Sequence, residues 1–273
     1  VIFAQGFGRQ QIGQILDGIH GRIADGPSAE GVYLIRLTAA TEAGAVLDAL
    51  AALRKNSGVL FAAAAADRGL PQAIYQAARK GDAVAQYRVG EIYDLGRGVA
   101  QDYREAVQWY RRSAEQGYAQ AQFALGEMYK NGDGVAKDLA QAAHWYRLAA
   151  EQGNPGAQLL LGVLHESGLG VALDFREAAK WYRQSADRGD ARAQLLLGVC
   201  YQLGQGVSRN LVVAYALYSV SARNDSSPGN PAPNHRAQLA RSMSPAEIDA
   251  AKGLSGAMSR AGSSPLAMTT TYT

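Results

Sequence analysis

The sequence of 273 residues has few of the residues from which metal and disulfide sites are built. Its single cysteine, Cys200, excludes an intramolecular disulfide and a zinc site made of cysteines. The four histidines are scattered along the chain and form no H-x-x-x-H or H-E-x-x-H pattern. We therefore expect neither a metal centre nor a bound cofactor.

Long apolar runs and a strong excess of one charge are missing as well. The longest apolar segments, residues 159–164 and 59–66, are shorter than the roughly 18 residues that a membrane-spanning helix needs. Lys and Arg number 27 against 24 Asp and Glu, a net charge of +3, and residues 81–224 contain 15 of each sign. The composition thus predicts no transmembrane segment, and the balanced central region disfavours binding to nucleic acid.

The sequence also lacks the motifs that mark common catalytic sites. The pair Gly96-x-Gly98 is not followed by Lys or Ser/Thr at the spacing of a phosphate-binding loop, and it recurs four times. Neither a G-x-S-x-G nucleophile elbow nor an S-x-x-K motif occurs. We expect no catalytic residues and no enzymatic activity; the enzyme alternative, a hydrolase of cell-wall or β-lactam substrates, would require a named nucleophile, acid or base.

What the sequence does contain is an internal repeat of 36 residues. Four units follow one another without insertion or deletion, at residues 81–116, 117–152, 153–188 and 189–224. A fixed period of this size is typical of solenoids, in which each unit packs only on its neighbours. In the first unit, the ten positions identical in all four units are Gly81, Ala85, Gln86, Gly90, Gly96, Gly98, Val99, Ala106, Tyr110 and Ala114.

Each unit is predicted to form two helices joined by a glycine loop. The first helix, helix A, has apolar residues at helical spacing. Gly96 and Gly98 follow at positions where the end of a helix favours left-handed backbone angles. Asp102 then starts the second helix, helix B, as its N-cap, with Glu105 at capping-box spacing.

An aromatic pair in helix B and a glycine in the middle of helix A indicate close packing of the two helices. The pair is Trp-Tyr in three units and Leu217-Tyr218 in the fourth. A mid-helix glycine costs on the order of 1 kcal/mol relative to alanine, so packing must compensate, and the aromatic pair is the expected filler. Because these residues recur in register, we assign them to structure and not to a ligand cage. The structural positions are Gly90, Gly96, Gly98, Trp109, Tyr110, Gly126, Trp145, Tyr146, Gly162, Trp181 and Tyr182.

The pattern A-x3-LG-x2-Y-x2-G-x-GV-x2-D-x3-A-x2-WY-x3-A-x2-G, as it stands in residues 121–153, resembles the Sel-like repeat, a relative of the tetratricopeptide repeat. The resemblance covers residues 81–224. It implies an all-α fold, a right-handed α-solenoid that acts as a protein-interaction scaffold without catalytic residues, commonly in bacterial envelope, signalling or host-interaction proteins. A location in the bacterial envelope or periplasm is expected from this resemblance only. The fourth unit departs from the pattern at Asn210, Leu217 and Arg223, which we interpret as erosion at the end of the array.

Residues 1–80 admit two interpretations. In the first they are mainly helical and end in a degenerate repeat, with Leu70 and Ile74 in the register of a helix B and a loop at residues 56–59. Residues 1–30 are then expected to form a helix followed by a loop.

The alternative is a small α/β module in the same segment. Residues 32–37 and 58–63 would be strands and residues 41–54 a helix. This arrangement would resemble half of the peptidoglycan-binding SPOR fold.

After the array, residues 225–262 are predicted to form a loop and a C-terminal capping helix. The helix is expected to start at Ser244-Pro245, with Ser as cap, Pro in the first turn and Glu247 reaching back. Its apolar residues, Leu254 among them, would cover the exposed end of the solenoid. Residues 263–273 are expected to be a disordered tail.

The helix A positions that point away from the predicted core form one stripe, which in related solenoids lines the concave face. The stripe changes from charged residues in the first two units to apolar residues in the last two, which favours binding of an amphipathic helix or an extended tail. Alternatively, Leu196 and Val199 pack under the C-terminal helix. The predicted partner-binding residues are Arg88, Glu91, Ala124, Glu127, Leu160, Val163, Leu196 and Val199.

The sequence therefore predicts a non-catalytic scaffold that binds a protein or peptide partner on the concave helix A face. The alternative is an envelope protein whose N-terminal segment contacts peptidoglycan while the repeats recruit a partner. Cys200 stands at a repeat position that is apolar in the other three units, and His165 at one that is tyrosine in the other three. Both are therefore predicted to be packing residues.

Overall fold

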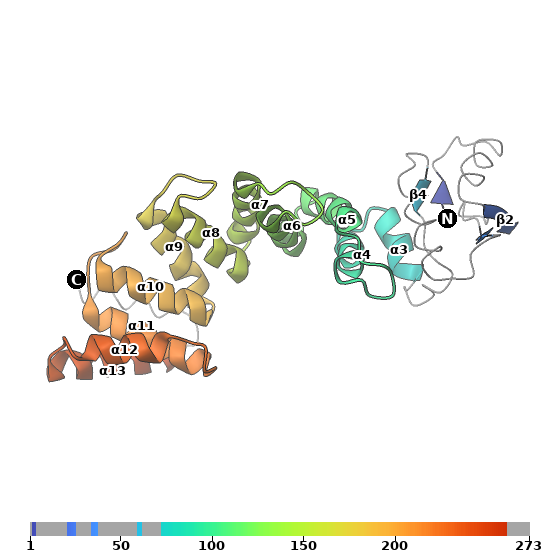
Figure 1. Cartoon of the computed structure of the whole chain (residues 1–273). Coiled ribbons are helices and arrows are strands. Elements are labelled where there is room, and N and C mark those ends of the chain that lie inside the picture. The colour runs from blue at the N-terminus through green and yellow to red at the C-terminus, as the bar shows by residue number, and fades with distance from the viewer. Residues whose placement is uncertain (1, 4–20, 26–33, 38–58, 62–71, 261–273) are drawn as a thin grey trace.

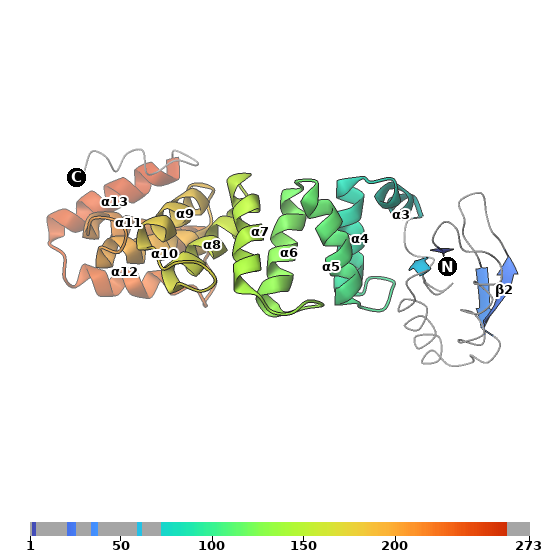
Figure 2. The same ribbon diagram turned by 90° about the horizontal axis from the view of Figure 1, so that it is seen from above.

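The computed structural model describes residues 2–3, 21–25, 34–37, 59–61 and 72–260, and most of this part is a row of helices. The helices are α3 (Gln72–Arg79), α4 (Ala83–Leu95), α5 (Tyr103–Glu115), α6 (Ala119–Asn131), α7 (Leu139–Glu151), α8 (Pro155–Ser167), α9 (Phe175–Asp187), α10 (Ala191–Leu203), α11 (Leu211–Asn224), α12 (Ala232–Ala240) and α13 (Pro245–Arg260). They form a curved array (Figure 1), in which α4 to α7 stand side by side (Figure 2). The predicted all-α solenoid of 36-residue units is therefore confirmed for the repeat region.

Helix A of each repeat is α4, α6, α8 or α10, and helix B is α5, α7, α9 or α11. The predicted helix ends are confirmed: Gly96 follows α4 with a φ of 64°, in the left-handed region. Asp102 caps α5, since its Oδ1 atom accepts hydrogen bonds from the N–H groups of Arg104 and Glu105 at 3.1 and 3.2 Å. Asp138 and Asp174 cap α7 and α9 in the same way.

The mid-helix glycine of helix A lies against the tyrosine of helix B. A Cβ atom added to Gly90 would be 2.5 Å from the ring of Tyr110, and the equivalent glycines give 2.6 to 2.7 Å. The tyrosine is thus the member of the aromatic pair that fills the space over the glycine. The tryptophan packs elsewhere: Trp181 belongs to a cluster with Ala142 and Tyr146 of the preceding repeat.

A buried glutamine in each helix A connects three helices. The Nε2 group of Gln122 donates to the carbonyl oxygen of Ala114, at the end of the preceding helix B, at 3.1 Å. Its Oε1 atom accepts from Gln152, which follows its own helix B, at 2.7 Å. The same two contacts recur for Gln86, Gln158 and Gln194.

The second loop glycine packs on the backbone of the preceding repeat. A Cβ atom on Gly134 would lie 2.3 Å from the carbonyl oxygen of Tyr103, the first residue of α5. Gly170 meets Leu139 at the start of α7 in the same way, at 2.4 Å. These positions accept only glycine, because both the positive φ and the approaching main chain exclude a side chain.

The short helix α3 takes the place of a helix B before the first repeat. It packs on α4, and the carbonyl oxygen of Ala78 accepts the Nε2 hydrogen bond of Gln86 at 3.1 Å, as the last turn of each later helix B does. Ile74, which the sequence placed in the register of a helix B, packs against the first core cluster. Leu70 lies outside the described residues.

The described residues of the N-terminal segment form four short strands: β1 (Ile2–Phe3), β2 (Gly21–Asp25), β3 (Leu34–Leu37) and β4 (Val59–Phe61). β1 pairs antiparallel with β4, and β2 pairs antiparallel with β3. The helix expected within residues 1–30 is therefore wrong at Ile23, where main-chain pairing with β3 outweighs the helical spacing of the apolar residues. The loop expected at residues 56–59 is wrong at Val59, which starts β4.

β3 and β4 fall within residues 32–37 and 58–63, the two segments that the α/β alternative assigned to strands. The helix which that alternative places at residues 41–54 lies outside the described residues, as does the tail at residues 263–273.

The C-terminal helix caps the array as predicted. α13 begins at Pro245, and the N–H and Oγ groups of Ser244 both donate to Glu247 Oε2 at 2.8 Å. It packs on α11 and buries Ala251 and Leu254. The segment before α13 contains a helix, α12, where the sequence predicted a loop. Pro231, with a φ of −78°, precedes α12 and is already fixed near helical geometry.

The departures of the fourth repeat from the pattern fit this cap. Arg223 replaces an acidic residue, and its guanidinium donates to the carbonyl oxygen of Ser255 on α13 at 2.7 Å. Leu217, in place of Trp, is buried in the same cluster as Leu254. Arg223 and Leu217 suit a repeat whose neighbour is α13 and not another helix A, so the interpretation as erosion is wrong for these two residues. Asn210, the third departure, keeps the N-cap role and accepts a hydrogen bond from the N–H group of Val213 at 3.1 Å.

We predict that Gly162→Ala destabilises the protein. Its Cβ atom would lie 2.6 Å from the ring of Tyr182, so we expect a loss of about 1–3 kcal/mol even though alanine has the higher helix propensity. Gly253→Ala on α13 is the matched control, since nothing lies within 4 Å of its Cβ position; it should be neutral or stabilise by up to about 1 kcal/mol. Urea denaturation of both variants measures the difference, and equal midpoints would contradict it.

Candidate partner-binding surface

The predicted binding residues lie along the outward side of the four helices A, where the structure gives them different degrees of exposure. Arg88 is exposed, whereas Glu91 and Ala124 are half-buried. Leu160 and Leu196 stand at the position in the third and fourth repeats that Arg88 has in the first. Both are half-buried against the core, and their remaining surface faces solvent. Val163 and Val199 stand at the position equivalent to Glu91, and they too are half-buried against the core.

The C-terminal cap leaves part of the apolar half of this stripe exposed, although Leu196 and Val199 pack against the core cluster that also contains Leu254 of α13. α13 packs on α11, the helix B of the last repeat, and Leu196 and Val199 on α10 keep part of their surface exposed. The helix A stripe therefore offers an apolar strip, which we define as Leu160, Val163, Leu196 and Val199.

Tyrosine hydroxyls hold the polar side chains at the edge of this stripe. Because the tyrosine ring of helix B passes beneath the helix A glycine, its hydroxyl reaches the last turn of helix A. Tyr110 donates to Asp94 Oδ2 at 3.0 Å, and Tyr182 donates to Glu166 Oε2 at 2.6 Å. In the fourth repeat the acceptor is the amide oxygen of Gln202, at 2.6 Å from the Tyr218 hydroxyl.

The second repeat satisfies its tyrosine differently. Lys130 stands in the column of Asp94 and Glu166, so the Tyr146 hydroxyl donates instead to Glu127. The Lys130 ammonium also donates to both Glu127 oxygens, at 2.9 and 2.7 Å. The charge of Glu127, a predicted contact residue, is thus compensated within its own helix.

The first repeat carries an acidic group of side chains. The Tyr87 hydroxyl donates to Glu91 Oε1 at 3.0 Å, and burial together with this carboxylate raises the pKa of Tyr87. Burial also raises the pKa of Asp94, against the lowering effect of the Tyr110 hydrogen bond, and the charges of Asp133 and Glu91 add to the rise. Asp94 therefore lies close enough to both Glu91 and Asp133 to be repelled by their charges.

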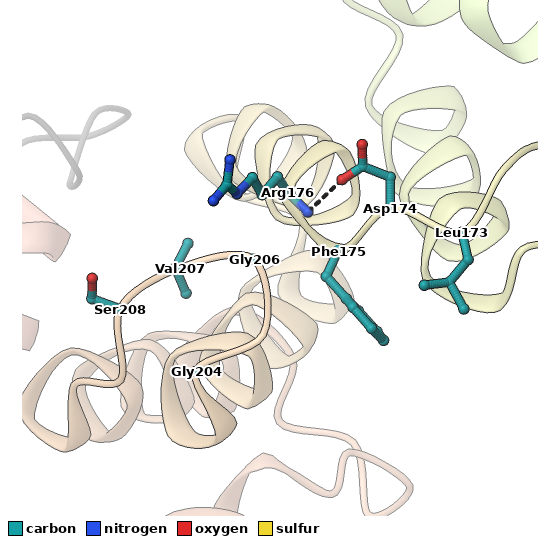
Figure 3. Close-up of a pocket in the computed structure, with 8 residues that line it drawn as sticks. All are labelled: Leu173, Asp174, Phe175, Arg176, Gly204, Gly206, Val207 and Ser208. Carbon is teal, nitrogen blue, oxygen red and sulfur yellow. Dashed lines mark hydrogen bonds between the residues drawn. The ribbon is translucent and has the colours of Figure 1, made fainter.

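Exposed leucines extend the apolar character to the loop edge of the third and fourth repeats. Leu203, at the end of α10, and Leu173, in the loop before α9, are each 58% exposed. Leu173 and the glycine loop that follows Leu203 line an open hollow beside the first turn of α9 (Figure 3). Leu203 continues the outward stripe of helix A one turn beyond Val199. Leu173 could not be identified from the sequence, because a loop position alone does not show whether a leucine is buried.

Cys200 and His165 are both buried, as predicted for packing residues. Burial, with a smaller effect from the Glu166 carboxylate, raises the pKa of the Cys200 thiol to about 12. The His165 Nδ1 atom lies 3.3 Å from the carbonyl oxygen of Ala172.

Among residues 72–260 and the four short strands, no helix is long and apolar enough to cross a bilayer. The same described residues contain no group of three His, Cys, Asp or Glu side chains that could hold a metal ion.

The hairpin units, their glycine loops and the glutamine contacts define an α-solenoid of short helical repeats. The family model for the Sel1 repeat matches residues 83–118, 119–154, 155–190 and 191–226. The chain belongs to the Sel1 repeat family. Repeats of this family typically mediate protein–protein interactions, and proteins built from them are generally non-catalytic scaffolds.

Two solved structures are similar in sequence as well as in fold. A Sel1 repeat protein from Oxalobacter formigenes is 37% identical over 57% of this chain and 65% of that chain, with a TM-score of 0.54. The protein c5321, a protective antigen present in uropathogenic Escherichia coli strains, is 34% identical over 72% of this chain and 41% of that chain, with a TM-score of 0.60. This chain thus spans less than two thirds of the length of either protein. No curated protein matches it.

We predict that Cys200 is unreactive in the folded protein. With a thiol pKa of about 12, the thiolate fraction is roughly a thousandfold below that of a free cysteine, and burial excludes the reagent as well. Ellman's reagent at pH 8 should give no rapid reaction with the native protein and one equivalent of product in 8 M urea. Stoichiometric labelling of the native protein within the mixing time would contradict this.

Proposed function

We propose that the protein binds a protein or peptide partner along the outward face of its helices A, which corresponds to the concave face of related solenoids. The observation that supports this most directly is the difference between the inside and the outside of the repeats. Interior columns are identical, as Gly90 and Tyr110 illustrate, whereas the outward column changes from Arg88 through Ala124 to Leu160 and Leu196. A purely structural array needs no such gradient.

The apolar strip supplies the affinity in this proposal. Its four side chains are already half-buried, so their conformations are restricted and little further entropy is lost when a partner covers them. Covering the part of each leucine that remains exposed contributes about 0.5–1 kcal/mol, a fraction of the value for a whole side chain, and the polar side chains held by the tyrosine hydroxyls border the strip. An amphipathic helix or an extended tail fits such a surface.

We predict that the double variant Leu160→Ser/Leu196→Ser loses its partner. Each truncation should weaken binding about two- to fivefold, because each removes the exposed part of an apolar side chain from the contact. Pull-down from lysate of the native source, with quantification of the bound proteins, measures the loss.

The matched control is Leu169→Ser, which removes an exposed leucine from the loop after α8. Circular dichroism must show that both variants remain folded. Equal recovery of all bound proteins by the wild type and the apolar-strip variant would contradict the proposal.

A second function for the N-terminal segment rests on its strand pairing. The first strand pairs with the last, and the two middle strands pair with each other. Both antiparallel pairs occur in a β-α-β-β-α-β unit, which in addition pairs its first strand with its third. That unit is the arrangement to which the predicted resemblance to a peptidoglycan-binding module points. We infer that an envelope role, with wall contact through this segment, is the second candidate.

Sedimentation with purified peptidoglycan sacculi tests this second function. The full chain should co-sediment, and a chain that starts at residue 72 should stay in the supernatant. Leu160→Ser/Leu196→Ser should sediment like the wild type, because the apolar strip is remote in sequence from the strands. A full chain that remains soluble in the presence of sacculi would exclude wall contact.

A further inference from the structure

The two helix layers of the first three repeats carry opposite net charges. α4, α6 and α8 contain two basic and four acidic residues, a net charge of −2. α5, α7 and α9 contain seven basic and five acidic residues, a net charge of +2. The helix A layer is thus acidic in a chain whose total charge is positive.

Internal contacts decide which of the helix A charges remain available. Lys130 compensates Glu127, which leaves the carboxylates of Glu91, Asp94 and Glu166 against the single guanidinium of Arg88. The tyrosine hydroxyls that bond to these carboxylates are neutral donors, so they fix the positions of the carboxylates without removing their charge.

The acidic and apolar parts of the face are consecutive. The carboxylates lie on α4 and α8, and the apolar strip lies on α8 and α10, where Leu203 extends it. Each helix A packs on the helices B before and after it, so the four helices A follow one another along the array. A helix of about 18 residues is roughly 27 Å long at 1.5 Å per residue, enough to cover more than one helix A, since packed helices are roughly 8–10 Å apart.

We propose that the partner which covers this face is a basic amphipathic helix, with lysine or arginine side chains over α4 to α8 and apolar side chains on the strip. This inference rests on the proposed function and specifies its partner. Charge complementarity selects the partner, because a like-charged segment would place its carboxylates against Glu91, Asp94 and Glu166. Arg192, on α10, lies at the apolar end, away from the cationic half of such a helix.

The test uses two synthetic 18-residue peptides labelled with a fluorophore. One has leucines at helical spacing in one half and lysines in the other, and the second has glutamate in place of every lysine. Fluorescence anisotropy with the full chain should show binding of the lysine peptide, weakened as salt is raised, and binding of the glutamate peptide weaker by more than about tenfold.

Charge-removing variants show whether the helix A carboxylates cause the difference. Glu91→Gln/Asp94→Asn keeps an oxygen acceptor for both tyrosine hydroxyls, as Gln202 does naturally in the fourth repeat. This variant should bind the lysine peptide several-fold more weakly than the wild type does, and its affinity for the glutamate peptide should not fall. Glu115→Gln/Glu151→Gln, which removes two exposed carboxylates from helices B, is the control and should leave both peptides unchanged.

Equal affinities for the two peptides, or a lysine peptide unaffected by Glu91→Gln/Asp94→Asn, would overturn the inference. So would no binding of either peptide. The proposed function is tested separately in each of these cases, by whether Leu160→Ser/Leu196→Ser loses a natural partner. Loss of the natural partner together with equal peptide affinities would identify an apolar binding face without charge selection.

Discussion

The hydrogen bonds of one buried glutamine per repeat hold the array in register. Each such side chain donates to the main-chain carbonyl of the helix before it and accepts from the residue that ends the helix after it. A buried amide satisfied on both sides stabilises the joint modestly, whereas a displaced neighbour would leave a buried donor and acceptor unpaired, at a cost of about 1–3 kcal/mol each. The spacing between helices A, and thus the surface they present, follows from this contact.

The interior of the repeats could be predicted from the sequence because it depends on local rules that recur. A glycine opposite a tyrosine, an aspartate at the start of helix B and a glycine at the end of helix A each have one physical interpretation, and four copies make it unambiguous. The outward face was less predictable. In the sequence, Glu127 is predicted to be a solvent-facing contact residue. In the structure it accepts a hydrogen bond from the Tyr146 hydroxyl, and the Lys130 ammonium compensates its charge.

The end of the array shows why deviations from a repeat need their neighbours to be understood. Arg223 and Leu217 look like lost consensus residues in the sequence, and in the structure they hold the capping helix. Which residue suits a position depends on what packs against it, and the last repeat has a partner that the others lack. α12 was not predicted because it has only nine residues, with one proline inside it and another directly before it, and so carries little periodic signal.

The loop glycines have a consequence for how such a chain changes over generations. Gly134 and Gly170 abut main-chain atoms of the preceding repeat, and the glutamine also bonds to a main-chain carbonyl. These main-chain contacts do not depend on the side chains of the unit before, and the side chains that do pack across the joint, such as Trp181 against Ala142 and Tyr146, belong to positions that recur in the repeats. A gene segment encoding 36 residues can be duplicated or deleted and still form a proper joint, so the length of the face can evolve independently of the residues displayed on it.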